Sequence, residues 1–326
     1  MSQAIVAQTL GGPEVLQLSE TEKPVPGPGQ LLVKVAAAGV NFIETYQREG
    51  RYQVPLPFTP GAESAGVVEE IGEGVTDFAP GDRVATAEGQ RSYAEYTLIE
   101  ASKALPVPEG LDLEIAAALP LQGMTAHYLI NSSFKVEAGH TILTHAGAGG
   151  VGLLLTQLLK AKGATVITTV STDEKEALAK ASGADYVLRY HDESGRGFAE
   201  KVREITAGRG VEAVLDGVGK DTFDGSLASL AIRGSLVLYG GASGAVPPVD
   251  PMRLNAGGSL FLTRPTLAHH TLTAEERRWR SSEIFDAVTN GSLNVRIGGR
   301  YPLAEAAQAH RDLQARKTTG KLLLLP

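Results

Sequence analysis

The sequence predicts an α/β fold in which a doubly wound parallel sheet is inserted into a β-rich, barrel-like domain. Strand and helix patterns alternate repeatedly after Thr141, and short strands separated by glycine turns fill the part of the chain before residue 120. A chain of 326 residues also exceeds what one hydrophobic core usually fills, so we expect two domains. We assign residues 1–120 and 261–326 to one domain, and residues 121–260 to the inserted one.

The first part of the chain shows the period-two patterns of short strands. Two alternating runs predict a hairpin, and a Pro- and Gly-rich segment at residues 24–29 ends it. The predicted strands are Ala4–Gln8, Val15–Ser19, Gln30–Ala38, Gly66–Ile71 and Ser92–Ile99. Helical spacing predicts short helices over Asn41–Arg48, Glu114–Leu119 and Gln122–Asn131.

From Thr141 onward apolar runs and amphipathic segments take turns. The predicted strands are Thr141–Thr144, Thr165–Val170, Tyr186–Arg189, Val211–Asp216, Gly234–Tyr239 and Ser259–Thr263. The predicted helices between them are 150–162, Asp173–Ser182, Gly197–Thr206 and Thr222–Leu230. Repeated strand–helix units form a parallel sheet with helices on both faces. Beyond them we expect helices over Ala274–Thr289 and Leu303–Ala315 and a final strand over Lys321–Leu325.

The first strand–helix turn of the inserted domain carries a glycine fingerprint. The run His145-Ala-Gly-Ala-Gly-Gly-Val-Gly152 places Gly147, Gly149 and Gly152 in the pattern G-x-G-x-x-G. In a Rossmann-type domain these glycines allow the tight turn, the approach of a pyrophosphate and close packing of helix on strand. The free N–H groups at the start of the helix, from Gly150 and Val151, attract phosphate. We therefore predict a dinucleotide site here.

The end of the next strand indicates which dinucleotide binds. An NAD site carries Asp or Glu about 20 residues past the glycines, at the strand end, to hold the ribose 2′-hydroxyl. Here Ser171 and Thr172 follow the strand, and Lys175 comes shortly after them. A hydroxyl and an ammonium suit a 2′-phosphate, so we predict NADPH (the reduced form of NADP). The alternative is that Ser171 and Thr172 only cap the next helix and Lys175 is solvated.

Composition narrows the class of protein further. The net charge is −7 without a basic tract, which argues against a nucleic-acid partner. Long apolar stretches are interrupted by Gly, Pro or charge, so we predict no membrane span, and the N-terminus does not read as a leader. The sequence has no cysteine, which rules out disulfides and thiolate metal ligands. We expect a cytoplasmic protein.

Several stretches together resemble one family. They are Gly39-Val-Asn-Phe-Ile-Glu-Thr-Tyr46, Pro60-Gly-Ala-Glu-Ser-Ala-Gly-Val-Val68, Leu121-Gln-Gly-Met-Thr-Ala-His-Tyr128, His145–Gly152, Asp216-Gly-Val-Gly219 and Arg264-Pro265. The chain resembles, almost end to end, the zinc-free quinone oxidoreductases, the zeta-crystallin-like branch of the medium-chain dehydrogenase/reductases. The resemblance implies a GroES-like catalytic domain, NADPH as cofactor, a quinone as substrate in a cleft between the domains, and a homodimer paired through a sheet edge.

The resemblance also implies site residues. Asn41, Tyr46 and Tyr52 match the substrate side, where an amide and two phenols could bind carbonyl oxygens and flank a flat ring. Thr125, Tyr190 and Lys321 match cofactor contacts, beside the glycines, Ser171 and Lys175. Gly240 and Ser243 are predicted cofactor residues because they follow a strand where a doubly wound sheet opens its ligand crevice. Arg264 could contact the cofactor or lie at a subunit contact. Without the resemblance, a turn residue or helix cap is the favoured interpretation of Asn41, and Tyr46 and Tyr52 could simply pack.

The zinc-dependent relatives carry a cysteine near position 41 and a Gly-His-Glu motif, where this chain has Asn41 and Gly61-Ala-Glu63. The seven histidines, at 127, 140, 145, 191, 269, 270 and 310, lack the spacing of a metal site. We therefore expect no metal. Two other functions stay open. The same scaffold could reduce α,β-unsaturated aldehydes or ketones, with Tyr46 or Tyr52 as the proton donor, or it could bind NADPH without catalysis, as crystallin-like proteins do.

Overall fold

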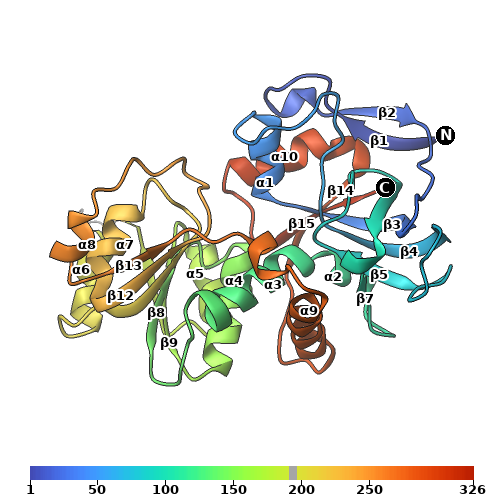
Figure 1. Ribbon diagram of the computed structural model, residues 1–326. Helices are drawn as coiled ribbons and strands as arrows, with labels where there is room; N and C mark the ends of the chain where they lie inside the picture. The colour runs from blue at the N-terminus through green and yellow to red at the C-terminus, as the bar shows by residue number, and fades with distance from the viewer. Residues whose placement is uncertain (191–196) are drawn as a thin grey trace. The chain divides into compact units, whose positions relative to one another are not determined.

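The computed structural model describes residues 1–190 and 197–326 (Figure 1). The chain divides into two compact units, one made of Met1–Met124 with Leu272–Pro326 and the other of Thr125–Thr271. The second unit is thus inserted in the sequence of the first. The predicted boundaries lay at 120/121 and 260/261. In the described part of the chain, no helix is both long and apolar enough to cross a bilayer.

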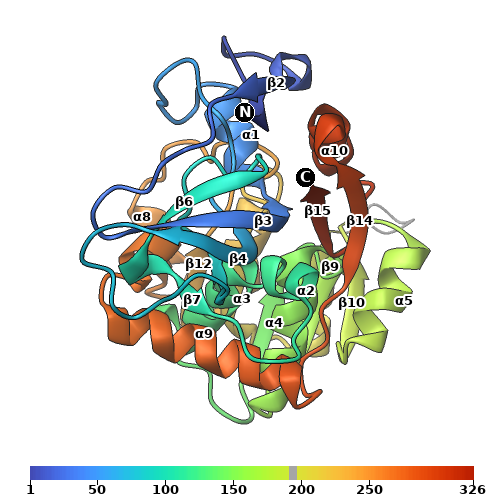
Figure 2. The same cartoon turned by 90° about the vertical axis from the view of Figure 1, so that its right-hand side faces the viewer.

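The first unit is built on a seven-stranded, mainly antiparallel sheet of order β14-β15-β3-β4-β5-β7, with β6 also paired to β3. Its strands are β3 (Gln30–Val40), β4 (Ser64–Ile71), β5 (Arg83–Thr86), β6 (Tyr96–Glu100), β7 (Leu105–Pro106), β14 (Ile297–Pro302) and β15 (Lys321–Leu325). A separate hairpin joins β1 (Ser2–Val6) to β2 (Gln17–Thr21). Figure 2 shows β3 and β4 side by side in this unit.

Five helical segments in this unit bear on the site or its support. They are α1 (Phe42–Arg48), α2 (Leu113–Ala117), the start of α3 (Pro120–Tyr128), α9 (Ala274–Thr289) and α10 (Ala306–Gln314). One apolar cluster joins β1, β3, β15 and α10 through residues such as Ile5, Val40, Leu322 and Ala309. Alternation along β3 and β15 puts these side chains on a buried face, so both strands are held by packing as well as by pairing.

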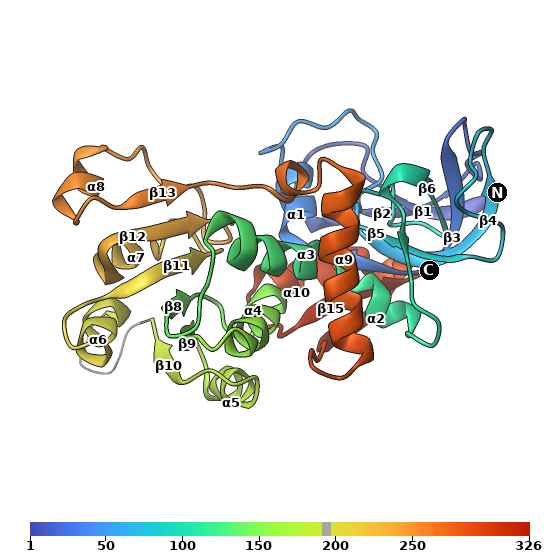
Figure 3. The ribbon, with the colours of Figure 1, turned by 60° about the horizontal axis from the view of Figure 1, so that its bottom comes forward.

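The second unit is a six-stranded parallel sheet of order β10-β9-β8-β11-β12-β13. Its strands are β8 (Thr141–Thr144), β9 (Thr165–Val170), β10 (Tyr186–Arg189), β11 (Val211–Asp216), β12 (Leu230–Leu238) and β13 (Phe261–Thr263). The helices that connect them are α4 (Gly150–Ala161), α5 (Asp173–Ala181), α6 (Phe198–Ile205), α7 (Phe223–Ser229) and α8 (Met252–Ala256). Figure 3 shows α4 and α5 on one side of this sheet and α6 and α7 on the other side.

This strand order confirms the predicted Rossmann-type fold, because it runs outward in both directions from β8 and β11. From β8 the chain adds strands toward one edge of the sheet, and from β11 it adds them toward the other edge, so the switch point lies between these two strands. Ligands of such sheets bind at the carboxyl ends of the strands there. The last residues of β8, β9 and β11 therefore mark the candidate site.

Some elements differ from the sequence-based expectation. The first hairpin is shifted, with β1 and β2 in place of Ala4–Gln8 and Val15–Ser19. The predicted helix Gln122–Asn131 ends as α3 at Tyr128 and continues as one π-helical turn, Leu129–Ser133. Strand β14 and helix α8 were not expected, because glycine interrupts the first and the second is very short.

Candidate cofactor and substrate site

The glycine fingerprint forms the turn between β8 and α4. A Cβ atom on Gly147 would overlap the side chain of Thr168 on β9, and one on Gly152 would overlap the carbonyl oxygen of Ala146. Gly149 caps α4 with extended backbone angles, so Gly150 and Val151 begin the helix. The N–H groups at this end have no intrahelical acceptor and favour an anion. The turn thus has the shape that a pyrophosphate requires.

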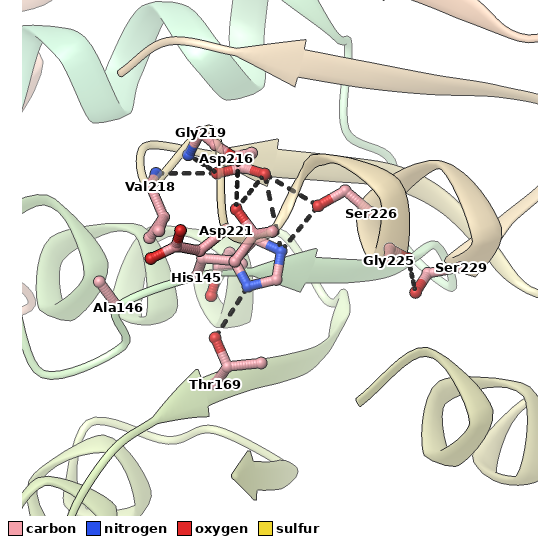
Figure 4. Close-up of polar contacts among 12 residues, drawn as sticks. His145, Ala146, Thr169, Asp216, Val218, Gly219, Asp221, Gly225, Ser226 and Ser229 are labelled. Atoms are coloured by element: carbon pink, nitrogen blue, oxygen red, sulfur yellow. Dashed lines mark hydrogen bonds and ion pairs between the residues drawn. The ribbon is translucent and has the colours of Figure 1, made fainter. Parts of the chain in front are cut away.

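A chain of buried polar side chains lies directly beneath this turn (Figure 4). Asp216 accepts hydrogen bonds at Oδ2 from Thr222 (2.7 Å) and from Ser226 (2.9 Å). His145 lies 2.9 Å from Ser226 Oγ through Nε2, and 2.8 Å from Thr169 Oγ1 through Nδ1. All these groups are buried, and burial lowers the pKa of His145.

The direction of each bond in this chain follows from Asp216. An ionised carboxylate can only accept, so the Ser226 hydroxyl gives its proton to Asp216 and must accept from His145 Nε2–H. Nδ1 of the neutral ring then accepts from Thr169. These hydrogen-bonded side chains join the ends of β8, β9 and β11 to α7. They therefore fix the strand ends that carry the glycine turn.

Asp216 also shapes a second glycine segment. Its Oδ1 accepts the N–H groups of Val218 (2.8 Å) and Gly219 (3.0 Å). The predicted site residues Gly240 and Ser243 lie against this segment. A Cβ on Gly240 would overlap the backbone of Gly217, and Ser243 Oγ donates to Val218 O at 2.8 Å. The Asp216 carboxylate therefore shapes the loop after β11, and the hydroxyl of Ser243 ties the loop after β12 to it.

The residues predicted to recognise the 2′-phosphate gather after β9. Thr172 caps α5 by accepting from Lys175 N at 3.3 Å, and Lys175 Nζ lies 3.5 Å from Ser171 Oγ. Thr172 thus caps the helix, while the exposed Ser171 and the partly buried Lys175 lie together at its start. Asp173, two residues after Ser171, forms an ion pair with Arg189, which sits opposite Val170 in the sheet. Its negative charge is therefore balanced.

Three further predicted cofactor residues also lie in this unit. Tyr190 accepts at its hydroxyl from Ala146 N at 3.2 Å, which brings it to the glycine turn. Thr125 is buried on α3. Arg264 follows β13, is exposed, and donates to Pro265 O at 3.3 Å. Tyr190 therefore contacts the glycine turn, whereas within residues 1–190 and 197–326 no hydrogen bond joins Thr125 or Arg264 to that turn.

The predicted substrate residues lie in the first unit, on and after α1. Asn41 precedes α1 and is almost fully buried. Its Oδ1 accepts from Lys321 Nζ (2.7 Å), and its Nδ2 donates to Glu63 Oε2 (2.9 Å). Lys321 and Glu63 also form a buried ion pair. The ammonium of Lys321, which was predicted as a cofactor contact, thus binds Asn41 and Glu63.

Tyr46 and Tyr52 form an aromatic pair beside Asn41's helix. Their ring centroids are 6.0 Å apart, and the guanidinium carbon of Arg51 lies 5.3 Å from the Tyr46 centroid. Tyr52 is 49% exposed, whereas Tyr46 is partly buried. A flat, electron-poor ring could stack on such a pair, and an exposed phenol could donate a proton.

Sequence reasoning missed the roles of four residues that organise the cofactor and substrate sites: Glu44, His145, Arg189 and Asp216. Glu44 stands three residues after Asn41, the spacing of a capping box, and its Oε2 accepts Asn41 N at 2.8 Å. His145 and Asp216 end apolar strands directly before glycine runs. A polar residue at a buried strand end was the signal that could have marked both.

The histidines do not form a metal site in the described part of the chain. No three His, Asp or Glu side chains within residues 1–190 and 197–326 come together to hold an ion. His145 uses both ring nitrogens in hydrogen bonds, as does His310, which contacts Arg48 and Tyr93. His191 lies outside the described residues.

Comparison with known proteins identifies the family. Residues 27–109 match the model "Alcohol dehydrogenase GroES-like domain", and residues 150–284 match "Zinc-binding dehydrogenase". The first match confirms the predicted GroES-like domain.

Full-length relatives narrow this assignment. The solved structure of a mycobacterial protein complexed with NADPH is 53% identical, covers 100% of both chains and has a TM-score of 0.97. The Escherichia coli quinone oxidoreductase complexed with NADPH is 39% identical over 99% of this chain and 100% of its own, with a TM-score of 0.96. The 2-haloacrylate reductase of a Burkholderia species is 43% identical over 100% of this chain and 99% of its own. The chain therefore belongs to the quinone oxidoreductases of the medium-chain dehydrogenase/reductase superfamily.

Proposed function

We propose that this protein is an NADPH-dependent quinone oxidoreductase. The observation that carries the proposal is the pair of glycine loops at the β8/β11 switch point, where added Cβ atoms would overlap the backbone or Thr168. Solved relatives with this fold are complexed with NADPH. When bound, NADPH supplies a hydride from its nicotinamide ring. The protein's own task is to hold the cofactor and the acceptor in place.

The residues present fit NADPH. Gly150 and Val151 offer N–H groups to the pyrophosphate, and Ser171 and Lys175 offer a hydroxyl and an ammonium to a 2′-phosphate. Arg189 balances the charge of Asp173, which would otherwise repel that phosphate. We also propose Thr125, Tyr190 and Arg264 as cofactor contacts on the resemblance stated above, and Gly240 and Ser243 because their loop follows a strand at the crevice of the sheet.

The family model's name implies zinc, and the residues here do not fit it. Where zinc relatives place a cysteine and a histidine, this chain has Asn41 and Ala62. The ammonium of Lys321 already lies between Asn41 Oδ1 and Glu63 Oε2. A cation placed on these same oxygens would meet that positive charge. We therefore derive no step through a metal. Asn41, Tyr46 and Tyr52 are the groups that we propose for the acceptor.

The relationship to a 2-haloacrylate reductase favours a second candidate, reduction of activated alkenes. That reaction needs a proton for the carbon next to the activating group. Tyr52 offers an exposed phenol 6.0 Å, ring to ring, from Tyr46. Steady-state rates with a small quinone and with an enone or enal separate the two activities.

The decisive experiment measures oxidation of NADPH and of NADH by a panel of quinones. We expect turnover with NADPH, and Lys175→Glu should weaken NADPH binding far more than NADH binding. Tight NADPH binding without turnover by any quinone would instead indicate a non-catalytic, crystallin-like role. Equal loss for both nucleotides in the variant would refute recognition of the 2′-phosphate by Lys175.

Two further features are proposals. A homodimer through the exposed edge strand β13 agrees with the family resemblance and with the exposed Phe261 on that strand. A cytoplasmic location stays a prediction, which cell fractionation tests.

A further inference from the structure

Three strand ends of the seven-stranded sheet meet around Asn41. Strand β15 pairs antiparallel with β3, with Leu322 opposite Val40, and β3 pairs antiparallel with β4, with Ala38 opposite Ser64. Asn41 follows β3, Glu63 precedes β4 and Lys321 begins β15, so the sheet itself delivers all three residues to one place. Gly39 leaves room for them, since a Cβ atom there would overlap the Glu63 carboxylate.

The chemistry of the two partners permits only one orientation of the Asn41 amide. Lys321 can only donate, and it lies 2.7 Å from Oδ1; Glu63, when ionised, can only accept, and it lies 2.9 Å from Nδ2. Gln122 Nε2 also points to Oδ1, at 3.4 Å. If the amide were flipped, its NH2 group would face the Lys321 ammonium, donor against donor, and its oxygen would face the Glu63 carboxylate, acceptor against acceptor. The orientation is therefore fixed by charge, and Nδ2 keeps one N–H beyond the one given to Glu63.

Both partners of Asn41 are buried and bonded within this cluster. Glu63 is fully buried, its Oε1 accepts Leu121 N at 2.7 Å, and its Oε2 accepts from both Asn41 and Lys321. Lys321 is 1% exposed. An ammonium buried this deeply and shared between two oxygens is poorly placed to bind a phosphate, whereas it is well placed to hold an amide.

We infer that Lys321 and Glu63 are positioning residues, which hold the Asn41 carboxamide so that its remaining N–H donates to an oxygen of the carbonyl substrate. The inference rests on the proposed function, because it assigns Asn41 to the acceptor side. It replaces the predicted role of Lys321 as a cofactor contact. Lys321 contributes to the reaction only through the amide that it orients.

The test is Lys321→Ala with chemical rescue. We expect kcat/KM for a small quinone to fall by about 10-fold or more, as misplaced catalytic groups typically cause, while the Kd for NADPH, measured by its fluorescence, stays unchanged. Propylammonium should restore part of kcat because it can donate to Asn41 Oδ1. Tetramethylammonium at the same concentration carries the charge without an N–H, and should not restore it.

Three results would overturn the inference: an NADPH Kd that rises in step with the loss of activity, equal rescue by both cations, or unchanged kcat/KM. Lys321→Met, which keeps the apolar stem, serves if the alanine variant does not fold, as judged by circular dichroism. Lys23→Met is the matched control, since it removes the half-exposed Lys23–Glu69 ion pair of the same unit. Absence of quinone turnover in the unmodified protein would refute the proposed function instead.

Discussion

At the scale of single residues, the buried carboxyl of Glu44 stands out. It is fully buried, and among the described residues its Oε1 has no hydrogen-bond partner. Burial, opposed by Lys321, raises the pKa of Glu44 to about 7. The folded state therefore binds a proton that the unfolded state releases near its usual pKa of 4.5. Stability from this group is greatest at low pH and declines as the pH rises from about 4.5 to about 7.

Glu44→Gln should remove this pH dependence. The shift corresponds to about 3 kcal/mol at ~1.4 kcal/mol per pKa unit, an order-of-magnitude figure. Compared with the unmodified protein, the variant should therefore gain stability between about pH 5 and about pH 8. Urea unfolding at both pH values measures the gain, with the exposed Glu73→Gln as control. Parallel stability curves for both proteins would show that Glu44 titrates normally.

Arg189 gives a second prediction at this scale. Its guanidinium pairs with Asp173 and lies 2.9 Å from Glu176. Arg189→Gln exposes the Asp173 charge beside Ser171, so we expect NADPH to bind roughly 5- to 10-fold more weakly while NADH binding changes little. Fluorescence titration measures both affinities. Lys180→Gln is the matched control because it also removes a cation from Glu176. A similar loss of NADPH affinity in that variant would show that the effect comes from the net charge of the region and not from Asp173.

At the scale of elements, the start of α4 depends on one glycine. A Cβ on Gly152 would overlap the backbone carbonyl of Ala146, and a backbone atom cannot rotate away. Gly152→Ala should therefore push α4 off the turn, lower the melting temperature and raise the NADPH Kd by about 10-fold or more.

Differential scanning calorimetry and NADPH titration measure these two effects. Gly197→Ala is the control, since the added Cβ meets no atom of the described residues within 4 Å and the residue has an ordinary φ of −73°. Unchanged NADPH affinity in Gly152→Ala would mean that the close approach of helix and strand is not needed for binding.

The elements also show what a sequence can and cannot predict. The predicted bounds of α9, Ala274–Thr289, are those observed, and the structure shows a local capping box of Thr273 and Glu276 at its start. Strand β14 was missed because Gly298 and Gly299 interrupt its pattern. A Cβ on Gly298 would overlap Thr319 O, so that glycine reflects contact with a distant segment. Local patterns do not contain such information.

The same limit applies to the site. Glycine spacing and strand ends indicated Gly147–Gly152, Ser171 and Lys175, because these features are local. The pairing of Lys321 with Asn41 was not accessible, since 280 positions separate the two residues and only β3–β15 pairing joins them. Lys321 was accordingly assigned to the cofactor by resemblance.

At the scale of the whole molecule, the exposed edge of the second unit's sheet makes a prediction about assembly. β13 ends the strand order, and Phe261 on it is 62% exposed. Edge strands with apolar side chains invite pairing with a second chain, and two copies related by a two-fold axis bury both edges. We expect light scattering to give twice the 34.2 kDa mass of one chain.

Phe261→Asp should shift the protein to monomers, because a carboxylate cannot be buried unpaired in such an interface. Thr266→Asp, beyond the strand end, adds the same charge as a control. A monomeric mass for the unmodified protein at working concentration would remove the dimer, while a dimer that survives Phe261→Asp would place the interface on another surface.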